Sequence, residues 1–215
     1  MKNHVSYILV LMICLIAVRP LNAQPPLHEP EMYIGAQAGV LASMVYFYPR
    51  LSQSALNPFW GANAGVVFRY NGHKYCGLQV ELNYMQRGWK DLSAGEARTR
   101  SMDFLEIPLL THIYFGNRYR GYINLGPQIG VLIRSEKSEK YTDYQYTEKV
   151  NLFDYGVTGG IGFYARTVAG VWQIESRFNY SLSNLFPASA GAAFANSNSM
   201  NLSLNFAYLW EFKHP

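Results

Sequence analysis

The sequence predicts an all-β fold, an eight-stranded antiparallel up-and-down barrel, on three observations. Apolar and polar residues alternate with a period of two through eight separate segments. The connections between these segments alternate between long and short. After residue 23, no segment approaches 18 consecutive apolar residues, which argues against a helix that crosses a membrane. The 215 residues are enough for one such domain.

The composition narrows the classes of protein. Charged residues make up 15% of the chain and aromatic residues another 15%, whereas an ordinary soluble domain has about 25% charged residues. Hydrophobic residues reach 49%, which argues against disorder. The two cysteines argue against a disulfide scaffold. The formal net charge of +4 is small and dispersed along the chain, so no nucleic-acid partner is expected.

Residues 1–23 are predicted to be a signal peptide. Lys2 precedes an apolar run from Tyr7 to Val18, and Ala23 offers a small residue at the cleavage position. This run is too short to span a bilayer as a helix but fits a secretory signal. Cys14 lies in the middle of the run, which argues against a lipoprotein. Cleavage would lower the formal charge from +4 to +2 and leave Cys76 as the only cysteine.

The clearest alternation covers residues 172–182. Its apolar face consists of Trp172, Ile174, Ser176, Phe178, Tyr180 and Leu182, and its polar face of Gln173, Glu175, Arg177, Asn179 and Ser181. The same pattern recurs over residues 78–84 and 201–212. Because successive side chains of a strand point to opposite faces, each segment has one apolar and one polar face.

Eight strands are predicted in this way. Their ranges are 32–45, 59–70, 75–87, 102–115, 121–134, 153–165, 170–182 and 199–212. The first, third, fifth and seventh connections span about 13, 14, 18 and 16 residues, whereas the other three span only four or five. This alternation indicates loops at one end of the barrel and tight turns at the other, with both termini at the turn end.

A soluble barrel of the lipocalin type is the competing interpretation, and the two differ in which face is apolar. A lipocalin lines its cup with apolar side chains, whereas here the polar face holds charges such as Glu81 and Arg177. Predicted strands of about 12 residues also match tilted transmembrane strands. We therefore expect a transmembrane β-barrel over residues 32–212 in the cell outer membrane. Both termini should be periplasmic, with residues 24–31 as an N-terminal periplasmic tail.

Five motifs along the chain resemble those of a known family. They are Glu81-Leu82-Asn83-Tyr84 with Arg87-Gly88, Leu105 to Leu110, Gly126-Pro127 through Leu132, Asp154-Tyr155-Gly156 with Gly160-Ile161-Gly162, and Glu175-Ser176-Arg177-Phe178. In these motifs the chain is similar to the PorT-like outer-membrane β-barrel family, often labelled a porin family, of Gram-negative bacteria of the Bacteroidetes type. The resemblance covers residues 32–212 and implies the barrel fold. Most members have no assigned activity, and one member is implied in type IX protein secretion.

Charged residues on the polar faces are expected to meet inside the barrel. They are Arg69, Glu81, Arg87, Glu106, Arg134, Glu175 and Arg177. An eight-stranded barrel is only wide enough for side chains to fill, so we predict a structural ion-pair network and a filled lumen rather than a pore. Acid–base catalysis by paired carboxylates is the alternative. Inward glycines such as Gly160 and Gly162 should make room for these long side chains.

Two prolines, Pro108 and Pro127, lie within adjacent predicted strands. Each removes one donor from the hydrogen-bond ladder of the sheet. We expect a local β-bulge at these positions, and a gate in the barrel wall is the alternative interpretation.

No catalytic, cofactor-binding or metal-binding residues are predicted. Nucleophilic catalysis needs a serine or cysteine within reach of a histidine. Of the histidines after residue 23, only His112 lies in a predicted strand, where we expect it to face inward with its hydrogen bonds satisfied. Cys76 should act as a small hydrophobic residue on the apolar face. The sequence contains neither an HExxH metal motif nor a phosphate-binding glycine loop.

The connection over residues 135–152 is the predicted interaction surface. It combines mixed charge with Tyr141, Tyr144 and Tyr146, a composition that suits a protein or glycan partner. A solvated loop with its tyrosines at headgroup level is the alternative.

At the turn end we predict a basic ring that faces anionic headgroups, beside an aromatic belt. The ring comprises Lys74, Arg118, Arg120, Arg166 and Lys213, and the belt Tyr70, Tyr75, Tyr122 and Trp172. Basic turns that serve only solubility are the alternative.

Taken as a whole, the sequence predicts a small non-enzymatic outer-membrane barrel with a structural, surface-interaction or secretion-accessory role. Its expected partners are outer-membrane lipid and, during insertion, the barrel-assembly machinery. The alternatives are an outer-membrane lipid-modifying enzyme, which would need a Ser, His and acid set within hydrogen-bond reach, and a soluble ligand-binding barrel.

Overall fold

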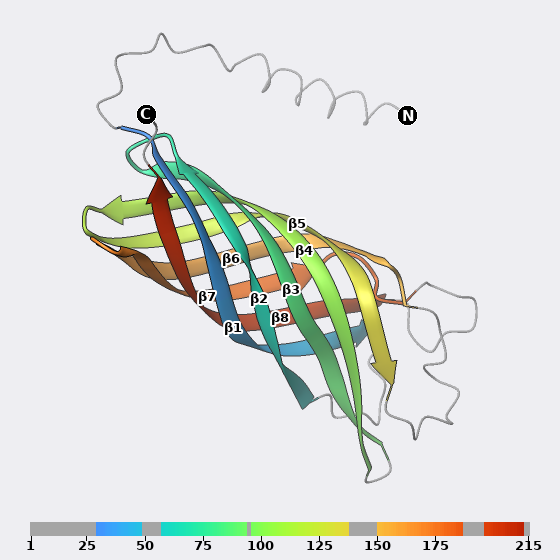
Figure 1. The fold of residues 1–215 in the computed structure, drawn as a ribbon. Helices are drawn as coiled ribbons and strands as arrows, with labels where there is room; N and C mark the ends of the chain where they lie inside the picture. The colour runs from blue at the N-terminus through green and yellow to red at the C-terminus, as the bar shows by residue number, and fades with distance from the viewer. Residues whose placement is uncertain (1–28, 49–56, 94–95, 138–149, 187–195, 213–215) are drawn as a thin grey trace, which may run out of the picture.

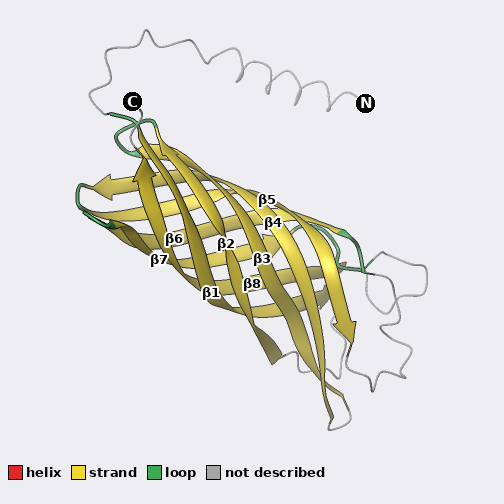
Figure 2. Cartoon of the chain, viewed as in Figure 1, coloured by secondary structure: helices red, strands yellow, loops and turns green. Residues whose placement is uncertain are grey.

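The computed structural model describes residues 29–48, 57–93, 96–137, 150–186 and 196–212. They form a closed antiparallel barrel of eight strands, in which each strand pairs with the next and β1 also pairs with β8 (Figures 1 and 2). The strands are β1 (Glu31–Tyr48), β2 (Asn57–Asn71), β3 (Cys76–Ser93), β4 (Glu96–Gly116), β5 (Tyr119–Lys137), β6 (Phe153–Thr167), β7 (Gly170–Ser181) and β8 (Asn196–Phe212). The predicted eight-stranded up-and-down barrel is confirmed. Within the described residues, no helix is long and apolar enough to cross a membrane.

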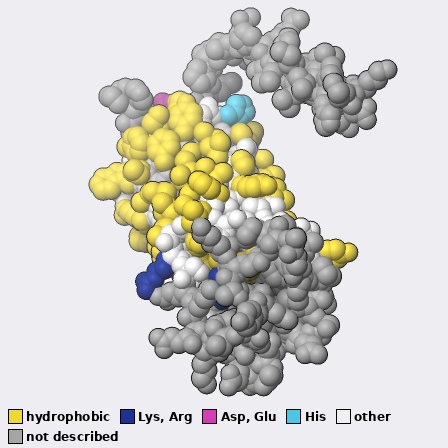
Figure 3. Space-filling view, turned by 90° about the vertical axis from the view of Figure 1, so that its right-hand side faces the viewer, with side chains coloured by type: hydrophobic (Ala, Val, Ile, Leu, Met, Phe, Trp, Pro, Cys, Tyr) yellow, Lys and Arg dark blue, Asp and Glu magenta, His cyan; other side chains and the backbone are white. Residues whose placement is uncertain are grey.

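The two faces of the wall differ as the alternation predicted. On β7, Trp172, Ile174 and Phe178 are 44–48% exposed, whereas Glu175 and Arg177 are buried inside the barrel. Side chains on the outer face are mostly hydrophobic in the described part of the surface (Figure 3). An apolar exterior around a polar interior is the arrangement of a transmembrane barrel and the reverse of a soluble ligand-binding barrel.

The barrel has two distinct ends. At the turn end, the connections between paired strands are residues 72–75, 117–118 and 168–169, and β1 begins and β8 ends there (Figure 1). Gly116 adopts a φ of 109°, a left-handed conformation that glycine allows in the tight turn to β5. At the loop end, the connections are residues 49–56, 94–95, 138–152 and 182–195.

One of the four predicted long loops is instead a β-hairpin. Residues 88–101 were expected to be a loop, but β3 and β4 remain paired from Gly88↔Ser101 to Ser93↔Glu96. The neighbouring strands end earlier, with the last pairs at Asn57↔Lys90 and Arg100↔Lys137. The hairpin therefore extends three residue pairs beyond the wall, roughly 10 Å at the usual rise of a strand. We call these three pairs, formed by residues 91–93 and 96–98, the hairpin tip; Figure 1 shows the hairpin projecting at the loop end.

The two strand prolines interrupt hydrogen bonding without forming bulges. Around Pro108, the β3–β4 pairing stops at Val80↔Leu109 and resumes at Asn83↔Glu106 in the same register. Around Pro127, the β4–β5 pairing has a gap of the same length. The prediction of bulges at these prolines is wrong, because a missing N–H deletes a hydrogen bond without inserting the extra residue that a bulge requires.

A bulge does occur higher on β5, and it changes the position of Arg134. The register of β4 and β5 shifts between the pairs Phe104↔Leu132 and Asp103↔Arg134, so that Ile133 is the extra residue. Beyond this point, inward and outward positions on β5 are exchanged. Arg134 lies opposite the outward-facing Asp103 and is exposed. The prediction that Arg134 belongs to the lumen network is therefore wrong.

Candidate functional site

The interior of the barrel holds most of the charged and polar side chains, and its centre is built around Arg177 on β7. The guanidinium of Arg177 binds Glu81 of β3 with two nitrogens, at 2.5 and 2.8 Å. Its Nε donates to Glu175 at 2.7 Å. All three side chains are buried. Together with Arg69 they form what we call the central cluster.

Arg69 completes this cluster through two glutamines. Its Nε donates to Gln79 at 2.6 Å, and its Nη2 donates to Gln173. Gln79 donates in turn to Glu81, and Gln173 donates to Glu175. No carboxylate within the described residues forms an ion pair with Arg69, so its charge reaches the two glutamates through the amides. The cluster thereby balances two cations against two anions, as a low-dielectric interior requires.

A second group of charges, the loop-end cluster, lies nearer the loops. Arg87 of β3 forms ion pairs with Glu106 of β4 and, at 2.6 Å, with Asp154 of β6. Ser181 and Ser183 donate to the Asp154 carboxylate at 2.9 and 2.5 Å. Arg87 and Glu106 were predicted to lie in the lumen, whereas Asp154 was not among the predicted residues. Its inward position on β6, two residues before inward Gly156, was the available signal.

Above the loop-end cluster, apolar side chains close the loop end. This apolar plug consists of Val45, Trp89, Met102, Phe104, Leu185 and Phe186. Leu185 and Phe186 come from the connection after β7, and backbone hydrogen bonds from Asn151 to Leu185 and from Leu185 to Ser197 hold that segment in place. The Arg100 guanidinium lies 5.5 Å from the Trp89 ring and 5.0 Å from the Phe186 ring, at cation–π distance.

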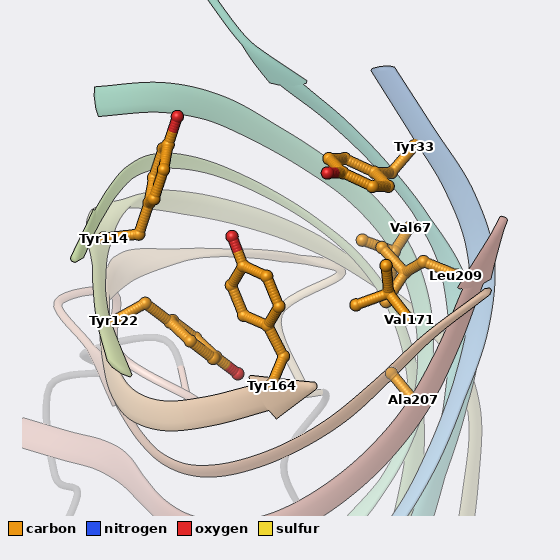
Figure 4. Close-up of a cluster of buried hydrophobic side chains, with 8 residues drawn as sticks. All are labelled: Tyr33, Val67, Tyr114, Tyr122, Tyr164, Val171, Ala207 and Leu209. Atoms are coloured by element: carbon orange, nitrogen blue, oxygen red, sulfur yellow. The ribbon is translucent and has the colours of Figure 1, made fainter. Parts of the chain in front are cut away.

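Between the centre and the turn end lies a layer of tyrosines. Tyr33, Tyr114, Tyr122 and Tyr164 point into the lumen from four strands (Figure 4). Tyr122 was expected in the outer aromatic belt, and that prediction is wrong because even-numbered positions of β5 face inward at this level. Tyr70, Tyr75 and Trp172 are exposed on the outer face.

His112 is packed within this tyrosine layer. Its ring lies 4.9–5.9 Å from the rings of Tyr114, Tyr122 and Tyr164. Its Nδ1 is 2.7 Å from the Asn124 side-chain oxygen. Its Nε2 has no hydrogen-bond partner within the described residues. His112 therefore faces inward as predicted, but the expectation that its hydrogen bonds are satisfied holds for Nδ1 alone.

The turn-end cluster closes the barrel on the other side. Arg120 of β5 binds Glu31 of β1 with two nitrogens, at 2.6 and 2.8 Å. Arg166 of β6 bridges Glu31 at 2.7 Å and Glu211 of β8 at 2.9 Å. Arg120 and Arg166 were predicted to face lipid headgroups, but both are paired with carboxylates. These two carboxylates were not predicted as partners, because Glu31 and Glu211 lie at strand ends rather than in the turns.

Between the apolar plug and the turn-end cluster, these layers fill the lumen with paired charges, amides and rings. Across the described residues, no group of three or more His, Cys, Asp or Glu side chains is arranged to hold a metal ion. Cys76 is exposed on the outer face at the turn end. The predicted signal peptide, Lys213, and the loop tyrosines Tyr141, Tyr144 and Tyr146 lie outside the described residues.

Comparison with protein families identifies this architecture. Residues 22–187 match the model of the outer membrane protein β-barrel domain family, which is more than half of the chain. The chain belongs to this family. As an outer-membrane barrel it has the apolar exterior that the bilayer requires, and its location is the outer membrane. Among curated proteins, none matches the sequence.

Several solved structures are similar to this chain at low sequence identity, and the first of them shares its fold. The outer membrane protein OprG from Pseudomonas aeruginosa is 12% identical, with a TM-score of 0.55 over 85% of this chain and 96% of OprG. Neisserial surface protein A is 11% identical, with a TM-score of 0.46 over 84% of this chain and 99% of that protein. Ail, the attachment invasion locus protein of Yersinia pestis, is 11% identical, with a TM-score of 0.44 over the same shares.

Proposed function

We propose that this outer-membrane barrel is a non-enzymatic scaffold whose filled interior stabilises the wall and whose loop end binds a partner at the cell surface. The observation that carries this proposal is the hairpin tip, which extends beyond the described ends of β2 and β5 and lies at the same end of the barrel as the apolar plug. In this proposal the termini and the turn end are periplasmic, in line with the short turns and long loops of outer-membrane barrels.

The packing of the lumen supports a scaffold rather than a channel. A continuous aqueous path would have to separate Arg177 from Glu81 and Glu175, and Arg87 from Asp154. Breaking one buried pair by removing a partner costs about 3–5 kcal/mol. Because an open path would have to break the ion pairs of both the central and the loop-end cluster, these pairs together oppose a conducting state.

The hairpin tip supports a surface-interaction role. Over residues 91–93 and 96–98, each strand is paired on one side only within the described residues, so one row of backbone N–H and C=O groups on each strand has no described strand beside it. Such edges can bind an extended segment of another protein by strand addition. In this proposal the tip contributes to the partner-binding surface, and so do Tyr141, Tyr144 and Tyr146, which lie outside the described residues.

The PorT-like resemblance, and with it a secretion-accessory role, is part of this proposal. The residues that carry the resemblance include Glu81, Arg87, Glu106, Glu175 and Arg177, which are among the lumen residues of the central and loop-end clusters. The motifs are therefore explained by barrel filling. The specific task of the protein must come from residues outside them.

The test compares the intact barrel with a variant in which residues 91–98 are replaced by Asn-Gly, so that Lys90 and Thr99 flank a two-residue turn. Both proteins are affinity-purified in detergent from the native outer membrane after cross-linking. We expect a partner that is retained by the intact barrel and lost from the shortened one. A partner set that is unchanged by the shortening would contradict the role of the hairpin.

Two further measurements test the scaffold itself. In planar bilayers the intact protein should give no stepwise ion conductance, and steady channels would contradict the filled lumen. In phospholipid micelles it should release no fatty acid, and release that persists in repeatedly purified protein would favour the lipid-modifying alternative.

A further inference from the structure

The turn end of the barrel contains a cavity of about 740 Å³. It lies between the β2–β3 turn and the β4–β5 turn, with Arg120 and Glu31 of the turn-end cluster in its lining. Lys74 and Arg118 line it from the two turns, and Arg166 lines it from β6. Four cations and one carboxylate therefore surround the same space.

The charges of the turn-end cluster compensate one another. Arg120 and Arg166 share Glu31, and Arg166 also binds Glu211, so two arginines face two carboxylates. Lys74 and Arg118 are exposed and form no ion pair within the described residues. The cavity consequently has an excess of two positive charges, both on its turns, and these favour an anionic ligand.

The two excess cations lie beside exposed tyrosines at the turn end. The Lys74 ammonium is 5.3 Å from the centre of the Tyr75 ring, and the Arg118 guanidinium is 5.8 Å from that of Tyr119. Tyr75 and Tyr119 are 51% and 60% exposed. Exposed tyrosines at the ends of transmembrane strands lie at headgroup level. The mouth of the cavity is thus at the depth where lipid phosphates lie.

We propose that this cavity binds the phosphate of an anionic phospholipid from the leaflet at the turn end. Lys74 and Arg118 contact the phosphate oxygens, because their donors are not held by carboxylates. Arg120 and Glu31 form the rigid base of the site, since each is already held by an ion pair. The site would anchor the turn end of the barrel to the inner leaflet, and it is independent of partner binding at the loop end.

The experiment uses the full-length mature barrel purified in detergent. Dioleoylphosphatidylglycerol, which is anionic, and dioleoylphosphatidylcholine, which is zwitterionic, are added in equal amounts. Native mass spectrometry then counts how many molecules of each lipid the protein retains. A basic residue near an anionic surface contributes ~1 kcal/mol, so Lys74 and Arg118 together correspond to a preference of about 30-fold for the anionic lipid. We expect a measured preference of tenfold or more. The double variant Lys74→Gln/Arg118→Gln should lose most of this preference. The control Lys90→Gln/Arg134→Gln removes two basic residues at the loop end and should keep it.

Several results would overturn the proposal. One is equal retention of the two lipids by the unmodified barrel, and another is an equal loss of preference in the control variant, which would indicate a general effect of net charge. A third arm adds inorganic phosphate at millimolar concentration without lipid. Phosphate that binds alone, with the same dependence on Lys74 and Arg118, would assign the cavity to a soluble anion instead of a lipid. Heat-dependent migration on electrophoresis verifies that every variant is folded.

Discussion

At the centre of the barrel, Arg177 binds two carboxylates at once, and each carboxylate also accepts hydrogen bonds from neutral groups. Glu175 accepts from the Tyr122 hydroxyl at 2.9 Å and from the Asn124 amide at 3.0 Å. Removal of one partner from such a network leaves the others buried without compensation, and this costs more than the intact pair contributes. The side chain of Glu175 is therefore a sensitive position for a test.

We expect Glu175→Ala to lower the free energy of unfolding by about 3–5 kcal/mol, because Arg177, Tyr122 and Asn124 each lose an acceptor. Urea unfolding in lipid vesicles measures the change. Glu175→Gln keeps an oxygen acceptor and should lose less. The control is Ser176→Ala on the outer face of the same strand. An unfolding midpoint that is the same for Glu175→Ala and the control would show that the network does not stabilise the barrel.

Two neighbouring glycines on β6 provide a matched pair. A Cβ at Gly160 would lie 2.2 Å from the Glu175 carboxylate oxygen, whereas at Gly159 the nearest atom would be 3.5 Å away. Gly160→Ala should therefore cost about 1–3 kcal/mol through displacement of Glu175, and Gly159→Ala should change stability by less than about 0.5 kcal/mol. The same unfolding assay compares them. Equal effects of the two substitutions would mean that inward glycines are not required to accommodate the charges.

At the scale of the strands, the hairpin tip differs from the rest of the wall in its number of neighbours. Positions 78–84 of β3 lie between β2 and β4, whereas among the described residues positions 91–93 pair with β4 alone. A two-stranded ladder is marginally stable in water. Amide hydrogens over residues 91–99 should exchange at least about tenfold faster than those over 78–84, as measured by hydrogen exchange with mass spectrometry. Equal protection would indicate that the tip is covered, by a partner or a second copy.

Some features of the strands could be predicted from the sequence and others could not. Alternation is a local signal, so all eight strands and the faces of most of their residues could be located from residue order alone, with Tyr122 as an exception. Pairing is not local, and the predicted loop at 88–101 is a hairpin because two polar segments continue their register. The outward position of Arg134 depends on one extra residue opposite β4, which no pattern within β5 indicates.

The residues of the candidate site also fall into two groups. The position of some follows from local alternation, and the position of others depends on how distant strands pair. Inward charges in mid-strand, such as Glu81 and Arg177, could be assigned to the lumen from their phase on the strand. Glu31 and Glu211 lie where strands end and phase is uncertain, so their pairing with Arg120 and Arg166 required the closed barrel. Partner choice within the lumen depends on the register of strands far apart in the chain, as with Arg87 and Asp154.

For the whole molecule, both ends are closed but by different means. The loop end is closed by the apolar plug and by Arg100 stacked on Trp89 and Phe186. The turn end is closed by ion pairs that connect β1, β5, β6 and β8. Since β1 and β8 carry the two chain ends, the turn-end cluster also ties the closing seam of the barrel to strands on other parts of the wall.

The proposed orientation places the turn end in the periplasm, and two single cysteines test it in a Cys76→Ala background. Leu152→Cys lies at the loop end, where the native side chain is 61% exposed, and Asn117→Cys lies in an exposed turn at the opposite end. A maleimide reagent that cannot cross the outer membrane should modify Leu152→Cys on intact cells. It should modify Asn117→Cys only after the membrane is permeabilised, because short turns face the periplasm. Both cysteines should react in purified protein in detergent, which controls for accessibility. Modification of Asn117→Cys, but not Leu152→Cys, on intact cells would reverse the orientation, and would move the lipid-binding cavity to the outer leaflet.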